Sequence, residues 1–333
     1  MMKSQWIAFI VVILNVFVFS GLSTASTEGT ISAASNTKFN GLFQFWGVND
    51  TQAAPWFNMK VKKAELKFSG SVIENTRWAV MADPAKSTSI APTSSTDNKI
   101  LQDLIWGWSP YENFEFVVGQ FKVPNSGQSL EPSGDLIFAE RAMSIRAFSD
   151  YREPGFMMSY KWNDFKFQTA ATNGGGNNVS DTTNSKDITA RVDYKFSDSL
   201  KFGIWGLAGD WHRYGTKGRF GGNARYVMNE WDLAGELIND HNGGSDRRGF
   251  DVEVGYMLNE KWQPCARVDG IDGFGPNAWV YSLGLNYFIN KNATKINAVF
   301  SKLKDAAGNG GAPLEVATGN MASLFVVSFQ TSI

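Results

Sequence analysis

Beyond Thr37 the amino-acid sequence alternates between apolar and polar residues with a period of two. In residues 187–195 every second residue is apolar, namely Ile188, Ala190, Val192 and Tyr194. Successive side chains of a strand point to opposite faces of a sheet, so this period indicates strands with one apolar face and one polar face. The pattern therefore predicts an all-β protein and leaves little room for helices.

Sixteen segments show this alternation, and most have about the length that a tilted strand needs to cross a bilayer. They cover roughly residues 37–48, 57–72, 76–84, 98–108, 113–122, 153–162, 164–172, 186–196, 199–211, 218–229, 230–240, 247–258, 261–270, 277–289, 293–302 and 321–332.

The connections between these segments alternate strictly between short and long. Short connections such as 229–230 and 259–260 are rich in Asn, Asp and Ser, as hairpin turns require, whereas 123–152 is the longest connection. A soluble β-sandwich has no reason to sort its loops in this way. An outer-membrane barrel has short periplasmic turns, longer extracellular loops and an even number of strands. We therefore predict a transmembrane antiparallel β-barrel of about 16 strands in residues 37–333.

The composition fits a protein whose apolar side faces outward. Hydrophobic residues make up 43% and aromatic residues 14% of the chain, yet its mean hydropathy is −0.22. A barrel combines an apolar exterior, aromatic belts at both membrane interfaces and a polar lumen. The aromatic residues near strand ends are predicted to form these belts, with the core of a β-sandwich as the alternative: Trp46, Trp56, Trp106, Trp108, Trp162, Trp211, Trp231, Trp262, Trp279 and Tyr287.

The N-terminus has the features of an export signal. Lys3 precedes an apolar run over residues 6–19, and small residues lead up to Ala25. This run is shorter than the roughly 20 residues of a transmembrane anchor, so we predict a signal peptide over 1–25 that is cleaved after Ala25. Residues 26–36 are expected to form a short periplasmic segment before the barrel. The predicted location is the outer membrane of a Gram-negative-type cell.

Several classes of protein are excluded by residue counts. Cys265 is the one cysteine, which excludes a disulfide scaffold or a multi-cysteine zinc site. The two histidines, His212 and His241, fall in predicted loops, and no catalytic motif accompanies them. A net charge of −1 gives no electrostatic footprint for nucleic acid. We expect no enzymatic activity, no cofactor, no metal site and no nucleic-acid partner.

The longest connection, residues 123–152, is unusually apolar. It contains Leu136, Ile137, Phe138, Ala142, Met143, Ile145 and Phe148. Because these side chains would be poorly placed on a solvated loop, we predict that this third extracellular loop folds into the barrel and constricts it, with a surface loop as the alternative. Sixteen strands enclose a lumen too wide for side chains to fill, so the barrel is expected to conduct water and solutes.

Short motifs in the sequence resemble those of a known family. Residues 118–124 (VGQFKVP), 135–141 (DLIFAER) and 152–155 (REPG) resemble, in this order, the phosphate-selective porin O and P family. Residues 61–66 (VKKAEL), 170–174 (AATNG) and 264–269 (PCARVD) extend the likeness over nearly the whole mature chain. The resemblance implies a sixteen-stranded, usually trimeric barrel that passes anions. It also implies the candidate pore residues Lys62, Lys63, Lys122 and Arg141, followed by Arg146 and Arg152.

Two details of the alternation refine this picture. Phe57, Met59 and Val61 follow one parity whereas Ala64, Leu66 and Phe68 follow the other, which predicts a β-bulge that turns both Lys62 and Lys63 toward the lumen. Parity also places twelve basic and ten acidic side chains on the lumen face. A dedicated phosphate channel is expected to have a clearer positive excess.

The sequence thus predicts a porin for passive diffusion of ions and small hydrophilic solutes, with a preference for anions such as phosphate as the narrower expectation. The expected partners are outer-membrane lipid, the solutes and two further copies in a homotrimer. A structural or adhesive barrel that acts through its extracellular loops is the alternative. A sheath around an electron-carrying protein is a third reading, disfavoured by the strand number and the inward loop.

Overall fold

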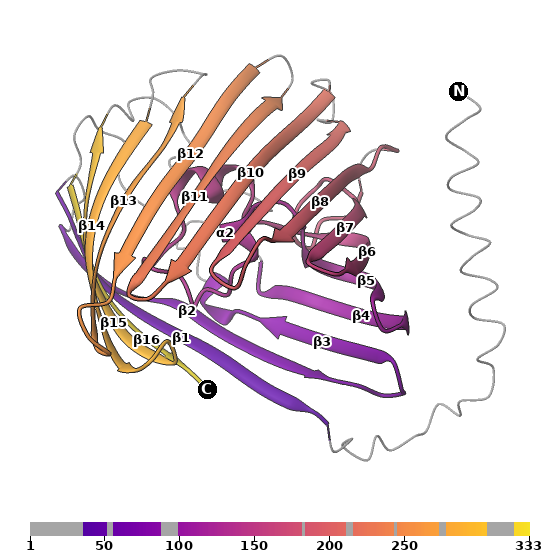
Figure 1. Ribbon diagram of the computed structural model, residues 1–333, viewed down its shortest axis with the longest axis horizontal. Helices are drawn as coiled ribbons and strands as arrows, with labels where there is room; N and C mark the ends of the chain where they lie inside the picture. Colours follow the sequence, from indigo (N-terminus) through magenta and orange to yellow (C-terminus); the bar gives the residue numbers. More distant parts are fainter. Residues whose placement is uncertain are drawn as a thin grey trace. The chain divides into compact units, whose positions relative to one another are not determined.

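The structure, a computed structural model, describes residues 36–51, 56–87, 99–181, 184–210, 216–242, 245–272, 278–304 and 323–333. The predicted signal peptide, all of the predicted periplasmic segment except Asn36, and parts of the long connections lie outside these residues. In the unit Lys38–Ile333, sixteen antiparallel strands form one closed barrel in which β1 pairs with β16 (Figure 1). The predicted fold class and number of strands are confirmed.

Each strand pairs with its neighbours in the sequence, so the topology is a simple meander. The strands are β1 (Lys38–Asp50), β2 (Phe57–Gly70), β3 (Thr76–Ala82), β4 (Leu101–Tyr111), β5 (Phe114–Lys122), β6 (Arg152–Trp162), β7 (Phe165–Thr172), β8 (Asp187–Lys195), β9 (Leu200–Asp210), β10 (Thr216–Met228), β11 (Trp231–Asn242), β12 (Ser245–Tyr256), β13 (Trp262–Asp272), β14 (Ala278–Asn290), β15 (Thr294–Lys304) and β16 (Ser323–Ser332). Three short helices, η1 (Pro84–Ser87), α2 (Gly127–Leu130) and α3 (Met143–Phe148), interrupt this pattern among the described residues. No helix in this part of the chain is long and apolar enough to span a membrane.

Three of the short connections are tight turns that have an asparagine in the left-handed region. Asn75, Asn163 and Asn229 adopt φ values of 59°, 51° and 52°, in the left-handed region. Asparagine tolerates this region better than most residues do, which explains why the sequence places it at these hairpins. The asparagines from which these short turns were predicted are therefore the residues that form them.

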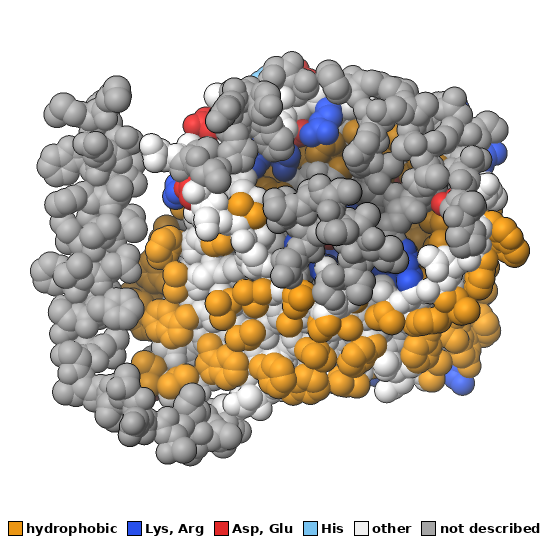
Figure 2. Space-filling view, turned by 180° about the vertical axis from the view of Figure 1, so that it is seen from behind, with side chains coloured by type: hydrophobic (Ala, Val, Ile, Leu, Met, Phe, Trp, Pro, Cys, Tyr) orange, Lys and Arg blue, Asp and Glu red, His pale blue; other side chains and the backbone are white. Residues whose placement is uncertain are grey.

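The two faces of the wall differ as the alternation predicted. On β14, Leu283 is 66% exposed whereas the next residue, Ser282, is 2% exposed and faces the barrel interior. Figure 2 shows hydrophobic side chains in a band across the outer wall. Pairs of tilted rings mark the ends of this band on one side of the barrel. The ring centroids of Trp262 and Tyr287 lie 4.6 Å apart near the short turns, and those of Phe250 and Trp279 lie 4.7 Å apart near the long loops.

The predicted β-bulge in β2 is confirmed. Gln44 of β1 pairs with Lys63, and the next residue, Phe45, pairs with Val61, so Lys62 has no partner of its own in the ladder. The extra residue restores the apolar parity of β2 on the outer face and leaves both lysines inside, where they contact residues of the third long loop.

A second irregularity changes the predicted bounds of β4. Met81 pairs with Asp103 and Ala82 with Leu101, so Gln102 is the extra residue there. The strand begins at Leu101 instead of residue 98, and it ends at Tyr111 instead of residue 108 because its pairing with β5 resumes at Tyr111 after a further shift.

The interfacial position predicted for Trp46 is wrong. Its side chain is 7% exposed and faces inward, because the alternation of β1 places Phe45 on the outer face and Trp46 on the inner face. The ring packs against Ala139 and Val326, and the ammonium group of Lys62 lies 4.7 Å from its centre. An inward Trp is stable here because the long loop after β5 covers its ring. The alternation of residues within a strand does not predict this contact with a loop. Trp211 lies outside the described residues.

We predict that a charge on the outer face of the apolar band destabilises the barrel, whereas the same charge in the lumen does not. Leu283→Arg should lower the free energy of unfolding in lipid by about 2–4 kcal/mol. Ala234→Arg, which adds the same side chain to the lumen wall, is the matched control and should cost far less. Urea unfolding in lipid vesicles measures both. Equal costs for the two variants would contradict the assignment of faces.

Candidate functional site

Residues 123–151, which we call the inner loop, connect β5 to β6 and run inside the barrel (Figure 1). The helices α2 and α3 of this loop contact β10–β13. Five of its apolar side chains are buried in three clusters. Met143 packs on β14 and β15, Ile145 and Phe148 pack on β9 and β11, and Ile137 and Phe138 pack on β13 and β15. All five are 3% exposed or less, so this loop is part of the packed interior of the barrel.

Two carboxylates of the wall accept the free amide groups at the starts of the loop helices. Oε2 of Glu236 accepts hydrogen bonds from the Ser126 hydroxyl at 2.9 Å and from the Gly127 amide at 3.0 Å, at the start of α2. Oδ1 of Asp269 accepts the Met143 amide at 2.8 Å, at the start of α3, where Ala142 offers no side-chain cap. First-turn amides lack partners within a helix, so the barrel wall supplies the caps.

Cations of the wall bind the carbonyl groups of the same loop. The Arg267 guanidinium donates to the Glu140 carbonyl oxygen at 2.8 Å, and Nζ of Lys295 donates to the Leu136 carbonyl oxygen at 2.7 Å. Arg191 and Arg219 donate in the same way to the carbonyls of Asn125 and Phe148. Hydrogen bonds from charged donors are stronger than neutral ones, so these four cations hold the loop along its length.

The six predicted pore residues form two groups on different sides of the inner loop. Lys63, Lys122, Arg141 and Arg152 line one cavity of about 440 Å³. Lys62 and Arg146 line a separate cavity of about 50 Å³ together with Glu140. The residues implied by the family resemblance do lie at the inner loop, but they are divided between two cavities and do not form one site.

Most members of the larger group are neutralised by neighbouring carboxylates. Nζ of Lys122 lies 2.8 Å from Asp150, and Nε of Arg152 lies 2.6 Å from Asp103. Lys63 donates to the Ser133 hydroxyl at 2.5 Å and lies 3.4 Å from Glu65. Their electric fields at the lumen are therefore reduced by adjacent negative charges.

Arg141 is occupied by the loop itself. Its side chain is 2% exposed, and its nitrogens donate to the carbonyl oxygens of Gln128 at 3.0 Å and Glu131 at 2.5 Å and to the Ser133 hydroxyl at 3.2 Å. Asp150 lies 3.8 Å away. This residue therefore holds residues 128–133 of the loop in place.

The smaller cavity has the clearest excess of positive charge, and we call it the cationic cavity. Its described lining includes Lys60, Lys62, Arg146 and Arg267 but one carboxylate, Glu140. Lys62 lies 3.0 Å from Glu140, whereas the guanidinium group of Arg146 makes no hydrogen bond or ion pair with any residue that the structure describes. A volume of about 50 Å³ has room for roughly three to five water molecules or one small anion.

Glu140 stays ionised in these surroundings. Burial by itself would raise the pKa of its carboxyl group, but the charges of Lys62, Arg146 and Lys63 outweigh burial and hold the pKa well below its usual range. A lowered pKa means that the stability gained from ionised Glu140 is present above about pH 4.5 and is lost only as the pH falls through the lowered value. The link between the inner loop and Lys62 therefore persists in mild acid.

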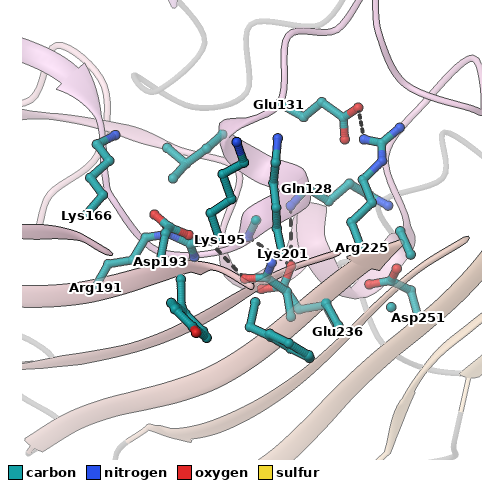
Figure 3. A pocket seen from close by; sticks show the side chains of 18 of the residues that line it. Gln128, Glu131, Lys166, Arg191, Asp193, Lys195, Lys201, Arg225, Glu236 and Asp251 are labelled. Atoms are coloured by element: carbon teal, nitrogen blue, oxygen red, sulfur yellow. Dashed lines mark hydrogen bonds and ion pairs between the residues drawn. The ribbon is translucent and has the colours of Figure 1, made fainter. Parts of the chain in front are cut away.

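A further cavity of the lumen is lined by both signs of charge, with seven carboxylates and five cations among its lining residues. This cavity of about 480 Å³ extends between α2 and strands β7–β12 (Figure 3). Figure 3 labels cations and carboxylates on the same wall, and Arg225 is bonded to both Glu131 and Asp232. Burial raises the pKa of Glu131 even though Arg225 opposes the change. This part of the lumen has no excess of positive charge.

Two cations of the cationic cavity were not among the predicted pore residues. Lys60 follows the same parity as Asn58 and lies between the outward-facing Met59 and Val61, so strand alternation alone would have placed it inside. Arg267 was placed on the lumen face by parity, but its role at the inner loop depends on a contact with residue 140 that the sequence does not reveal. Within the described part of the chain, no group of three or more His, Cys, Asp or Glu side chains is arranged to hold a metal ion.

The sequence matches a family model that agrees with this geometry. Residues 43–210, half of the chain, match the model for "Phosphate-selective porin O and P". The chain belongs to the phosphate-selective porin O and P family. It is therefore an outer-membrane channel for small solutes. A search of curated proteins found no match.

Solved porins share the fold of this porin at low sequence identity. The anion-selective porin from Comamonas acidovorans aligns over 89% of this chain and 99% of its own, with 14% identity and a TM-score of 0.67. OmpF from Salmonella typhi, in a complex with daunomycin, aligns over 89% and 98%, with 13% identity and a TM-score of 0.64. The trimer form of OmpT from Vibrio cholerae aligns over 89% and 99%, with 11% identity and a TM-score of 0.63.

Cys265 is a built-in reporter of the position of the inner loop. Its side chain is 6% exposed and lies in one cluster with Ile137 and Phe138. Lys295→Met removes the hydrogen bond to the Leu136 carbonyl and should speed maleimide labelling of Cys265 about tenfold or more, because a charge-assisted bond contributes about 1.5–3 kcal/mol. Labelling followed by intact mass measures the rate.

A matched control is available on the opposite wall. Gln168 of β7 bonds Ser159 of β6 and does not contact the inner loop, so Gln168→Ala should leave the labelling rate unchanged. If Lys295→Met and the unaltered porin label at the same rate, Lys295 does not hold the loop.

Proposed function

We propose that this porin passes small hydrophilic solutes by passive diffusion with a preference for small anions. The cationic cavity carries this proposal, because Lys60, Lys62, Arg146 and Arg267 face Glu140 alone among the described carboxylates of its lining. The two larger cavities hold both signs of charge in similar numbers. The inner loop acts as the constriction in this proposal, since it occupies the lumen between the cavities.

The preference is proposed for anions in general, with phosphate as one of them. Lys60 and Lys62 offer compact ammonium charges, whereas tight selection of phosphate is best served by the paired donors of arginine. Arg267 already uses its guanidinium on the Glu140 carbonyl and on Asp269, which lies 3.1 Å away. Arg146 is the arginine with donors available to a solute. The anion selectivity named for the porin from Comamonas acidovorans is consistent with this proposal.

Two variants should move the selectivity in opposite directions. Lys60→Gln combined with Arg146→Gln should lower the anion-to-cation permeability ratio about sixteenfold at low salt. Each unit charge about 10 Å from the solute changes the energy of an anion and of a cation by about 0.4 kcal/mol in opposite directions in water, and two charges are removed. Glu140→Gln removes the carboxylate and should raise the ratio. The zero-current potential of planar bilayers in a salt gradient measures both.

Lys302→Gln combined with Lys304→Gln is the control of equal charge, because both lysines lie on the outer face of β15. It should leave the zero-current potential unchanged. A potential that does not respond to the Lys60/Arg146 change would refute the assigned anion preference. Complete absence of open-channel current would instead favour the structural or adhesive barrel.

The signal peptide is proposed to be cleaved after Ala25 during export, so that the mature chain begins at Ser26. Three mature chains are proposed to form a homotrimer in the outer membrane. The charge pattern of residues 1–25 supports the cleavage, and the trimer form of OmpT supports the assembly. The chain is proposed to act as a channel and not as an enzyme, because the charged groups at the inner loop are engaged in holding that loop.

Mass spectrometry of protein purified from outer membranes tests both points. Under denaturing conditions the mass should equal that of residues 26–333, and under native conditions in detergent it should be three times as large. A native mass of a single chain would rule out the trimer, and a mass that includes residues 1–25 would rule out the cleavage. The two results are independent of each other.

A further inference from the structure

Two rows of like charge cross the inner face of the wall between β8 and β13. Residues directly opposite each other on neighbouring strands lie at one level and point to the same side of the sheet. The pairing of β8, β9 and β10 places three cations in one row, which we call the basic row: Lys195, Lys201 and Arg225. The pairing of β11, β12 and β13 places three carboxylates in another, which we call the acidic row: Glu236, Asp251 and Asp269. Because β10 and β11 are paired as well, the two rows adjoin on one stretch of wall.

The middle member of the basic row has no partner among the described residues. Nζ of Lys195 lies 2.6 Å from Asp198, and Arg225 is bonded to two carboxylates. Lys201 is exposed on the lumen side and makes no hydrogen bond or ion pair with any residue that the structure describes. Like charges directly opposite each other destabilise a sheet, so Lys201 costs stability in this position. Its ammonium group is available to an anionic group in the lumen.

The middle member of the acidic row also lacks a partner within the described part of the chain. Glu236 and Asp269 accept amides of the inner loop and are used in holding it. Asp251 lies between them with its side chain 2% exposed, and its Oδ1 atom is buried without a hydrogen-bond donor among the described residues. A buried carboxylate oxygen that accepts no hydrogen bond is costly, so this position favours an additional donor. The two flanking carboxylates favour a donor that carries positive charge.

Lys201 and Asp251 line the same cavity of about 480 Å³ between α2 and strands β7–β12. In Figure 3 the labelled lysines of this cavity lie to one side of Asp251. Three strand spacings separate β9 from β12, which corresponds to about 14 Å along the wall. The long lysine side chain and the curvature of the wall bring the two charged groups closer together than the strands themselves. A solute that meets both groups therefore has its own charges several bonds apart.

We propose that Lys201 and Asp251 bind the two ends of a small zwitterion, a solute such as a dipeptide that carries one carboxylate and one ammonium group. The carboxylate lies at Lys201 in the basic row. The ammonium group lies at Asp251, where its three N–H donors supply the missing hydrogen bond. A solute with a single charge leaves one of the two positions without a partner. This site rests on the proposed passage of small hydrophilic solutes and is independent of the anion preference, which is assigned to the cationic cavity.

Ligand-observed NMR with the full-length porin in detergent measures the Kd of defined probes. Glycylglycine carries both charges, N-acetylglycine carries the carboxylate alone, and glycinamide carries the ammonium group alone. Glycylglycine should bind most tightly of the three. Asp251→Asn should raise the Kd of glycylglycine and of glycinamide about fivefold, because two opposite unit charges about 4 Å apart in water attract by about 1 kcal/mol. Lys201→Gln should raise the Kd of glycylglycine and of N-acetylglycine by about the same factor.

Lys201→Arg keeps the charge and should keep the binding, which separates loss of charge from loss of structure. Lys302→Gln removes one charge on the outer face of β15 and is the matched control, with no change of Kd expected. Equal Kd values for the three probes, or an unchanged Kd of glycylglycine in either the Asp251→Asn or the Lys201→Gln variant, would overturn the proposal. Lys60→Gln combined with Arg146→Gln should bind glycylglycine as the unaltered porin does, so a failure of the anion preference and a failure of this site give different results.

Discussion

A backbone amide or carbonyl group that faces hydrocarbon finds its hydrogen bond within the protein or not at all. In this porin the demand is met by closure, because β1 pairs with β16 from Leu42↔Ser332 to Asp50↔Leu324 and leaves no free edge between the first and last strands. Closure in turn imposes strict alternation, since each strand has lipid on one side and the lumen on the other. The bulge at Lys62 obeys the same rule: it allows two polar residues in succession to face inward without turning an apolar residue away from the lipid.

The inner loop creates a second demand for hydrogen bonds inside the wide lumen. The backbone amides and carbonyls of this loop lie where no strand can pair with them, so charged side chains of the wall supply the partners. Glu236 and Asp269 accept hydrogen bonds from amides, while Arg267 and Lys295 donate to carbonyls. Several lumen charges of this protein therefore hold the inner loop in place. Net charge summed over the lumen face is for that reason a weak guide to selectivity, and the local excess in the cationic cavity is a better one.

Strand number, faces, hairpin turns and the bulge could be predicted from the sequence, because each depends on the order of neighbouring residues. The change of parity between Val61 and Ala64 was sufficient to place Lys62 and Lys63 inside. Trp46 and Arg141 could not be placed in this way. The ring of Trp46 is buried by Ala139, and the guanidinium of Arg141 by the carbonyls of residues 128 and 131, so both depend on how the inner loop crosses the lumen. Such contacts join positions far apart in the chain and leave no periodicity.

Strand β15 shows how far one parity decides the role of a side chain. Lys295 follows the inward parity, is 1% exposed and binds the inner loop, whereas Lys302 follows the outward parity and is exposed beside Tyr281. The two residues share a chemistry, and an odd number of positions separates them. A register slip of one residue would exchange their faces, burying one ammonium group in lipid and leaving the Leu136 carbonyl without its donor. Register in this strand is thus fixed at both ends by lysine, by the loop on the inside and by the membrane boundary on the outside.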